Sequence, residues 1–186
     1  MKKILNVGCG IDDYGTHFVD LFPQRKDVIQ CDLDRQKLPF PSNYFDEVYS
    51  KNLFEHLTNL GFAIKEMHRV LKKGGKLILI TDNANFFGFS IGKTHLGGYE
   101  ETRKLWGRKL IKKDRHYELF TDWHLRNYAK KVGFKMAKTE YMLEESENRN
   151  NLIRIKGQMV KFFSLLLRNT PLKRATYNLI KLEAIK

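Results

Sequence analysis

The chain has 186 residues, of which 42% are hydrophobic and 30% are charged, an ordinary composition for a globular protein. We expect one domain over residues 1–186, because a chain of this length buries a sizeable core as one unit. No segment approaches the roughly 20 consecutive apolar residues of a membrane-spanning helix, and the apolar run before Cys9 is too short for a signal peptide. Cys9 and Cys31 lack metal-ligand spacing, so we expect reduced thiols in a cytoplasmic protein.

Positive charge is concentrated in the second half of the chain. Residues 1–90 contain 12 Lys and Arg against 11 Asp and Glu, whereas residues 91–186 contain 22 against 10. A basic half fits nucleic acid, an anionic small molecule, a membrane surface or simply exposed helix faces. Because no ordered RNA-binding motif is present, we favour exposed helix faces and keep nucleic acid as an alternative.

The first predicted element is an apolar strand over residues 3–7, which runs into the glycine turn of the segment ILNVGCG. Gly8 and Gly10 allow positive φ and leave no Cβ, so a ligand can lie against the backbone. The nicotinamide fingerprint requires a third glycine at position 13, where this chain has Asp13. A dehydrogenase is therefore disfavoured.

Two more predicted strands, over residues 16–20 and 28–32, end in Asp20 and Asp32. A carboxylate at the end of a strand can accept hydrogen bonds from both hydroxyls of a ribose. In open α/β sheets, ligands bind outside the carboxyl ends of the strands, where the glycine turn and both carboxylates fall. The sequence therefore predicts a nucleoside site at this edge.

Two longer motifs follow the third strand. LPFPSNYFDEVYSKNLFEHL spans residues 38–57 and EMHRVLKKGGKLIL spans residues 66–79, so strand, helix, glycine turn and strand come in order. With LNVGCG, they make the chain resemble the class I S-adenosylmethionine-dependent methyltransferases, specifically the branch that acts on small molecules. The resemblance is dense over residues 3–82 and returns in LFTDWHLRNYAKKVGF at residues 119–134. It implies a Rossmann-like α/β fold, a mostly parallel sheet with an antiparallel C-terminal strand, and S-adenosylmethionine as methyl donor without a metal.

The resemblance also implies which residues bind the donor. The glycine turn would face its methionine part, Asp20 would bind the ribose, Asp32 would hold the adenine, and the residues past the fourth strand would lie near the sulfonium. The implied set is Gly8, Cys9, Gly10, Asp20, Leu21, Asp32, Leu33, Ser50, Lys51 and Asn52.

The chain departs from this family at the methionine end of the site. Many relatives have an acidic residue where Asn6 stands and a third glycine where Asp12 stands. Only five residues, Ile11 to Gly15, separate the turn from the second strand. We therefore expect the first crossover helix to be reduced or absent.

The remaining elements follow from periodicity and capping signals. Strands are predicted over residues 44–50, 76–82 and 134–141, and the final segment TYNLIKLEAIK predicts a last, antiparallel strand. A helix over residues 59–72 should end at Gly74-Gly75, and a second over residues 122–131 should have Thr121 as its N-cap and stop at Gly133.

Two insertions are expected to determine substrate choice. Residues 83–118 are rich in glycine and aromatic residues and predict a lid over the site. Residues 151–172 form an amphipathic stretch in which Arg154, Lys161 and Arg168 recur on one side. Such a helix fits a membrane surface, a second subunit in a homodimer, or its own domain.

Catalytic residues are the hardest to assign, because sulfonium is a good leaving group and a base is needed only for some acceptors. His95, His116 and Tyr117 lie in or beside the lid and are the weak candidates. No metal site is predicted, since Glu55-His56 lacks the second histidine of a zinc helix, and we expect this pair to anchor the turn after the fourth strand.

Three functions remain open. The leading one is methyl transfer to a small molecule, a glycan or a lipid precursor. The second is an RNA methyltransferase that uses the basic half. The third is a non-catalytic member that binds a partner, suggested by Asn6, Asp12 and the missing helix.

Overall fold

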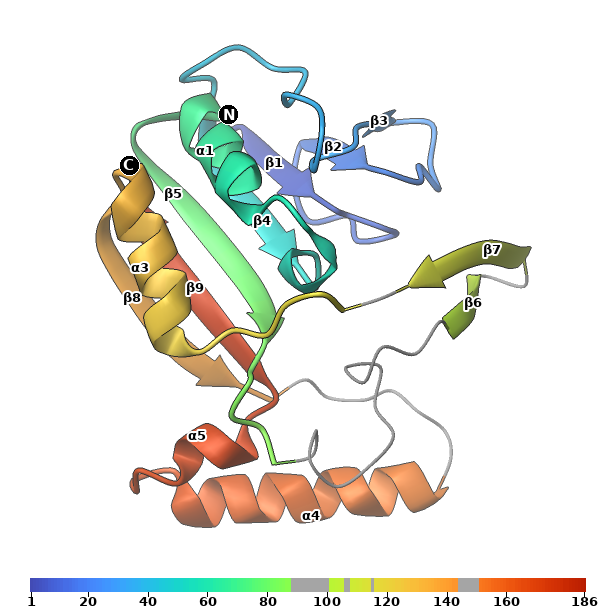
Figure 1. The fold of residues 1–186 in the computed structure, drawn as a ribbon, viewed down its shortest axis with the longest axis vertical. Helices are drawn as coiled ribbons and strands as arrows, with labels where there is room; N and C mark the ends of the chain where they lie inside the picture. The colour runs from blue at the N-terminus through green and yellow to red at the C-terminus, as the bar shows by residue number, and fades with distance from the viewer. Residues whose placement is uncertain (88–100, 106–107, 115, 144–150) are drawn as a thin grey trace.

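The computed structural model describes the chain except for residues 88–100, 106–107, 115 and 144–150 (Figure 1). Its main sheet has seven strands in the spatial order β3, β2, β1, β4, β5, β9, β8. They are β1 (Ile4–Val7), β2 (His17–Asp20), β3 (Val28–Gln30), β4 (Phe45–Lys51), β5 (Leu71–Asp82), β8 (Lys135–Met142) and β9 (Leu179–Ile185). The first five pair in parallel, and β9 lies antiparallel between β5 and β8. The predicted fold class is confirmed.

The helices and a small second sheet lie in the connections. The helices are η1 (Phe54–His56), α1 (Leu60–Val70), α3 (Asp122–Val132), α4 (Asn151–Leu167) and α5 (Lys173–Thr176). The second sheet pairs β6 (Glu101–Leu105) with β7 (Arg108–Asp114), inside the segment predicted as a lid. Much of that segment lies outside the described residues. None of the helices in the described part is both long and apolar enough to cross a membrane.

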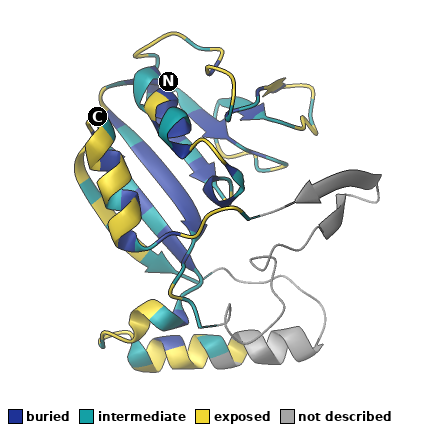
Figure 2. Ribbon diagram, in the orientation of Figure 1, coloured by how far each residue is buried: buried dark blue, intermediate teal, exposed yellow. Residues whose placement is uncertain are grey.

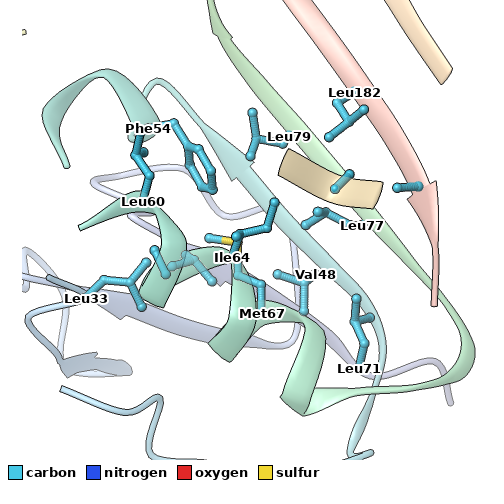
Figure 3. Packing of buried hydrophobic residues seen from close by; sticks show 14 of the residues in the cluster. Leu33, Val48, Phe54, Leu60, Ile64, Met67, Leu71, Leu77, Leu79 and Leu182 are labelled. Atoms are coloured by element: carbon cyan, nitrogen blue, oxygen red, sulfur yellow. The ribbon is translucent and has the colours of Figure 1, made fainter. Parts of the chain in front are cut away.

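Helices α1 and α3 pack on one side of the sheet, which we call the helical face (Figure 1). The chain moves in the same direction across the sheet from β4 to β5 and from β5 to β8, so right-handed crossovers put both helices on the same side. The apolar side of α1 is buried as its periodicity predicted. Figure 3 shows Ile64 and Met67 of this helix directed at Val48, Leu77 and Leu79 of the sheet.

The end of α1 differs from the prediction. The helix stops at Val70 and β5 begins at Leu71, so Gly74 and Gly75 lie inside the strand instead of ending the helix. Backbone hydrogen bonds hold the two glycines in the strand. Gly74 N–H donates to the carbonyl of Lys186 at 2.9 Å, and Lys186 N–H donates to the carbonyl of Gly75 at 3.0 Å. The glycine pair therefore joins β5 to the end of β9.

Helix α3 has the predicted ends. Thr121 is its N-cap, and the side-chain oxygen accepts from the backbone N–H of His124 in a capping box. Gly133 ends the helix in the left-handed conformation with φ of 111°. These caps fix the start and stop that the sequence indicated.

The opposite side of the sheet, which we call the loop face, is covered by short connections. The β1–β2 and β2–β3 connections move the other way across the sheet and contain no helix; the spacing predicted this for the first of them. Tyr14 from the first connection lies 4.6 Å from the ring of Tyr49, and its hydroxyl donates to Glu47 at 2.6 Å. Arg25 from the second lies over the ring of Phe18 at 4.3 Å. Side chains on loops thus take the place of helices here.

Candidate active site

The glycine turn after β1 is stabilised by backbone bonds to the neighbouring strand. Gly8 and Gly10 have φ of 70° and 51°, values that favour glycine. The N–H groups of Gly8 and Cys9 both donate to the carbonyl of Val19, at 2.9 and 3.3 Å. A Cβ added at Gly10 would meet nothing within 4 Å, so the turn is open on that side. The space beside Gly10 is therefore large enough for a ligand to approach the backbone.

Asp20 organises the turn directly. One carboxylate oxygen accepts from Gly10 N–H at 2.8 Å and the other from Phe22 N–H at 2.8 Å. A carboxylate has about four lone-pair sites, so two backbone donors leave room for hydroxyl donors. The sequence predicted the position of Asp20 but not its bond to the glycine turn.

Cys9 is buried beside this carboxylate. Burial, followed by the charge of Asp20, raises the pKa of the Cys9 thiol to about 11. The thiol therefore stays protonated near neutral pH and is a poor nucleophile.

The end of β4 meets the same turn. A Cβ at Gly8 would lie 2.8 Å from a methyl carbon of Leu53, so the turn packs directly on the segment after β4. Asn52, with φ of 52°, donates its N–H to the carbonyl of Ile80 at 2.9 Å. Ser50 is 1% exposed, and its hydroxyl has no hydrogen-bond partner in the part of the chain that the structure describes. Lys51 ends the strand.

The predicted adenine position lies just beyond β3, which ends at Gln30 instead of Asp32. Asp32 accepts from Asp34 N–H at 3.1 Å and lies 3.8 Å from Arg35. Leu33 is buried in the core of the helical face, and Leu21 is half-buried. The structure thus places Asp32 at the carboxyl edge but gives Leu33 a packing role.

The two departures from the family pattern also have a structural role. Asn6 is buried, and its amide donates to the carbonyl of Tyr14 at 3.1 Å. Asp12 accepts from Tyr14 N–H at 2.9 Å, while Asp12 N–H donates to the carbonyl of Cys9 at 2.7 Å. Both residues therefore hold the short loop that replaces a helix.

A second polar group lies at the ends of β4 and β5. Glu55 of η1 is 1% exposed and accepts from the Thr81 hydroxyl at 2.6 Å. Burial raises the pKa of Glu55, the Thr81 hydrogen bond opposes this, and the charge of Asp82 adds to it. Asp82 also lies 3.0 Å from Nδ1 of His116. Sequence reasoning missed Thr81 and Asp82, although Asp82 ends a strand at the predicted ligand edge.

Residues 116–118 are attached to η1 by their backbone. The N–H of Tyr117 donates to the carbonyl of Glu55 at 2.7 Å, and the ring of His116 lies edge-on to His56 at 4.5 Å. Ligand atoms of Glu55, His56 and His116 lie within 4.8 Å of one another, so this group could hold a metal ion. The Tyr117 side chain is exposed. His95 lies outside the described residues.

Sequence comparisons identify the N-terminal segment. Residues 5–79 match the family model described as a methyltransferase domain. The ubiquinone/menaquinone biosynthesis C-methyltransferase UbiE of Chromobacterium violaceum is 51% identical over 47 residues, which cover 25% of this chain and 19% of that protein. The chain thus spans about a fifth of the length of the curated relatives it matches.

Solved structures extend the likeness to the whole chain. A SAM-dependent methyltransferase from Archaeoglobus fulgidus has a TM-score of 0.63 and 16% identity, and the match covers 100% of this chain and 86% of that one. Phosphoethanolamine N-methyltransferase 2 of Haemonchus contortus, solved with S-adenosyl-L-methionine, has a TM-score of 0.57 and 18% identity, covering 100% and 49%. The chain therefore has the fold of the class I S-adenosylmethionine-dependent methyltransferases, and its sequence similarity to a methyltransferase domain lies in residues 5–79.

Proposed function

We propose that this protein transfers a methyl group from S-adenosylmethionine to a small-molecule acceptor. The observation that carries the proposal is the bond from Gly10 N–H to the Asp20 carboxylate, in a segment that matches the methyltransferase domain model. This bond joins the open glycine turn to the ribose-binding candidate at one edge of the sheet. When bound, S-adenosylmethionine would supply a methyl group attached to a sulfonium. The acceptor attacks the methyl carbon in line, and S-adenosylhomocysteine is the leaving group.

The donor-binding residues are those at the carboxyl edge. The backbone of Gly8, Cys9 and Gly10 lies against the methionine part, Asp20 accepts from the ribose hydroxyls, and Asp32 binds the adenine side. Residues 50–52 lie near the sulfonium and Leu21 contributes apolar contact, whereas Leu33, which the family resemblance also implied, packs in the core instead. The open side of Gly10 and the spare acceptor capacity of Asp20 support this arrangement.

The acceptor is a small molecule that loses a proton during the reaction. The sequence relatives are named as C-methyltransferases of ubiquinone and menaquinone biosynthesis. Methylation of carbon replaces a C–H bond with a C–C bond, so a proton must leave the acceptor. We assign removal of that proton to His116, whose Nδ1 lies 3.0 Å from the Asp82 carboxylate. Two buried free thiols, Cys9 and Cys31, favour a reducing compartment such as the cytoplasm.

Calorimetry with S-adenosylhomocysteine tests the donor site. Asp20→Ala removes charge-assisted acceptors and should weaken binding by about 1.5–3 kcal/mol. Asp13→Ala is the matched control, because it removes an exposed carboxylate from the connection that leads into β2. If Asp20→Ala binds S-adenosylhomocysteine as tightly as the wild type does, this carboxylate is not part of the site. If the wild type does not bind S-adenosylhomocysteine, a non-catalytic protein is favoured.

Turnover of a demethylated quinone precursor tests the acceptor step. His116→Asn should lower kcat by about 10²-fold or more while leaving the affinity for S-adenosylhomocysteine unchanged. Tyr117→Phe is the comparison, because its side chain is exposed and should be dispensable. A defined RNA that is bound at physiological salt and methylated would instead establish an RNA methyltransferase.

A further inference from the structure

Helix α4 turns an apolar surface away from the protein. Phe162, Leu165 and Leu166 are 63%, 55% and 64% exposed, and Phe163 is 43% exposed. At about 100° per residue, Phe162 and Leu166 lie on the side opposite Ser164, which is 1% exposed, and Leu165 lies beside them. Figure 2 shows exposed residues along the described part of this helix. An amphipathic helix normally buries its apolar side, so this orientation indicates a partner.

Basic residues flank this surface, without acidic ones. Residues 151–176 contain six Lys and Arg and no Asp or Glu. Among them, Lys161, Arg168, Lys173 and Arg174 are exposed. Bulky apolar residues beside lysines and arginines are what interfacial helices present to anionic lipids.

The orientation of α4 is fixed by contacts at the carboxyl edge of the sheet. The Ser164 hydroxyl donates to the carbonyl of Thr176 at 3.0 Å and thereby joins α4 to α5. The Asn83 side chain, just past β5, donates to the carbonyls of Arg174 and Tyr177, both at 2.7 Å. Figure 1 shows α4 and α5 beyond the end of β5. The apolar surface is therefore a built feature beside the ligand edge.

Two other occupants fit this surface less well. A second copy of the chain would bring two apolar surfaces together in a two-fold contact, but the lysines and arginines beside each of them, with no acidic residue in 151–176, would repel one another. A nucleic acid would use the lysines and arginines but would leave the outward phenylalanine and leucines in water. An anionic bilayer satisfies both the charge and the apolar side chains.

We propose that α4 and α5 dock on the surface of an anionic lipid bilayer. Helix α4 has 17 residues, about 25 Å in length, and would lie in the plane of the interface with Phe162, Leu165 and Leu166 inserted among the acyl chains. Docking turns the carboxyl edge of the sheet toward the lipid. It does not depend on methyl transfer, so it is measured without donor or acceptor.

Flotation with vesicles tests the docking. The protein should bind vesicles of phosphatidylglycerol and phosphatidylcholine in equal parts and not vesicles of phosphatidylcholine alone. Phe162→Asp with Leu166→Asp should lower the partition coefficient at least about tenfold, and Lys161→Gln with Arg168→Gln should lower it by about tenfold. Met136→Asp, at a residue that is 71% exposed on β8, is the matched control and should bind like the wild type.

All variants change exposed side chains, and thermal unfolding checks that each one folds. Equal binding to both vesicle types, or undiminished binding by the aspartate variant, would overturn the proposal. If the wild type does not bind vesicles but is a dimer, and the aspartate variant is a monomer, the surface binds a second copy of the chain. RNA binding that is lost only in the glutamine variant, without vesicle binding, would assign it to nucleic acid.

Discussion

The two faces of the sheet are covered in different ways. On the helical face, Leu77 and Leu79 of β5 are 0% exposed beneath α1. On the loop face, Ile78 and Ile80 of the same strand are 9% and 7% exposed, in a small cluster with Leu179. Helices bury the first face, whereas loops, paired rings and charged side chains shield the second. In the part of the chain that the structure describes, helices pack on one face of the sheet and loops on the other, and both faces meet at the edge that carries the glycine turn and Asp20.

Neighbouring residues of β5 measure this difference directly. Leu79→Ala empties part of a closely packed core and should lower the free energy of unfolding by about 3–5 kcal/mol. Ile80 is the next residue of the strand and lies on the opposite face. Ile80→Ala should lower the free energy of unfolding by about 1–2 kcal/mol less than Leu79→Ala does. Urea unfolding of both variants checks the difference. Equal losses would mean that the loop face is packed as tightly as the helical face.

An ion pair on the helical side gives the next largest effect. The Glu66 carboxylate binds Arg69 at 2.8 and 2.7 Å and accepts from Leu38 N–H at 3.0 Å, so it joins α1 to the connection before β4. Glu66→Gln should lower the free energy of unfolding by about 1.5–3 kcal/mol near neutral pH.

The same variant has a defined pH dependence. Burial alone would raise the pKa of Glu66, but hydrogen bonds and the charge of Arg69 lower it below the ordinary value of 4.5. A lowered pKa in the folded state stabilises the protein above the unfolded-state pKa, and this stabilisation is lost as the pH falls through the folded-state value. The difference between wild type and Glu66→Gln should therefore shrink below about pH 4.5. A difference that stays constant at acid pH would contradict the ion-pair account.

The smallest predicted effect tests the loop face. Tyr14→Phe removes the hydrogen bond to Glu47 and should lower the free energy of unfolding by about 0.5–1.5 kcal/mol. That hydrogen bond, with burial, raises the pKa of Tyr14 from 10.0 to about 12. The stabilisation should be present below pH 10.0 and decline as the pH rises through 12, with the difference between wild type and variant measured by urea unfolding. A difference that persists undiminished at the highest pH would exclude this bond as its source.

Local signals predicted much of the fold and the placement of Asp20 beside the glycine turn. The glycine turn and Asp20 follow from strand endings and from backbone freedom at Gly8 and Gly10, which are properties of a few adjacent residues. The caps of α3 are similarly local. The end of α1 was misplaced because Gly74 and Gly75 look like a helix stop, whereas their bonds to Lys186 depend on distant pairing.

Contacts between distant segments accounted for what was missed. The Tyr14 bond to Glu47 depends on the register of β1 beside β4, and the pairing of Asp82 with His116 joins two connections. The sequence predicted that residues 151–172 are amphipathic, but not that Ser164 faces inward while Phe162 faces out. Orientation of this kind is set by tertiary contacts, which periodicity does not contain.

Backbone NMR during titration with S-adenosylhomocysteine tests the central claim most directly. We expect saturable shifts in the amides of Gly8, Gly10, Asp20 and Asp32, with little change at the loop-face strand residue Ile78. Saturable binding that leaves the glycine-turn amides unshifted, or that shifts only residues of the loop face, would contradict the assignment of the ligand edge.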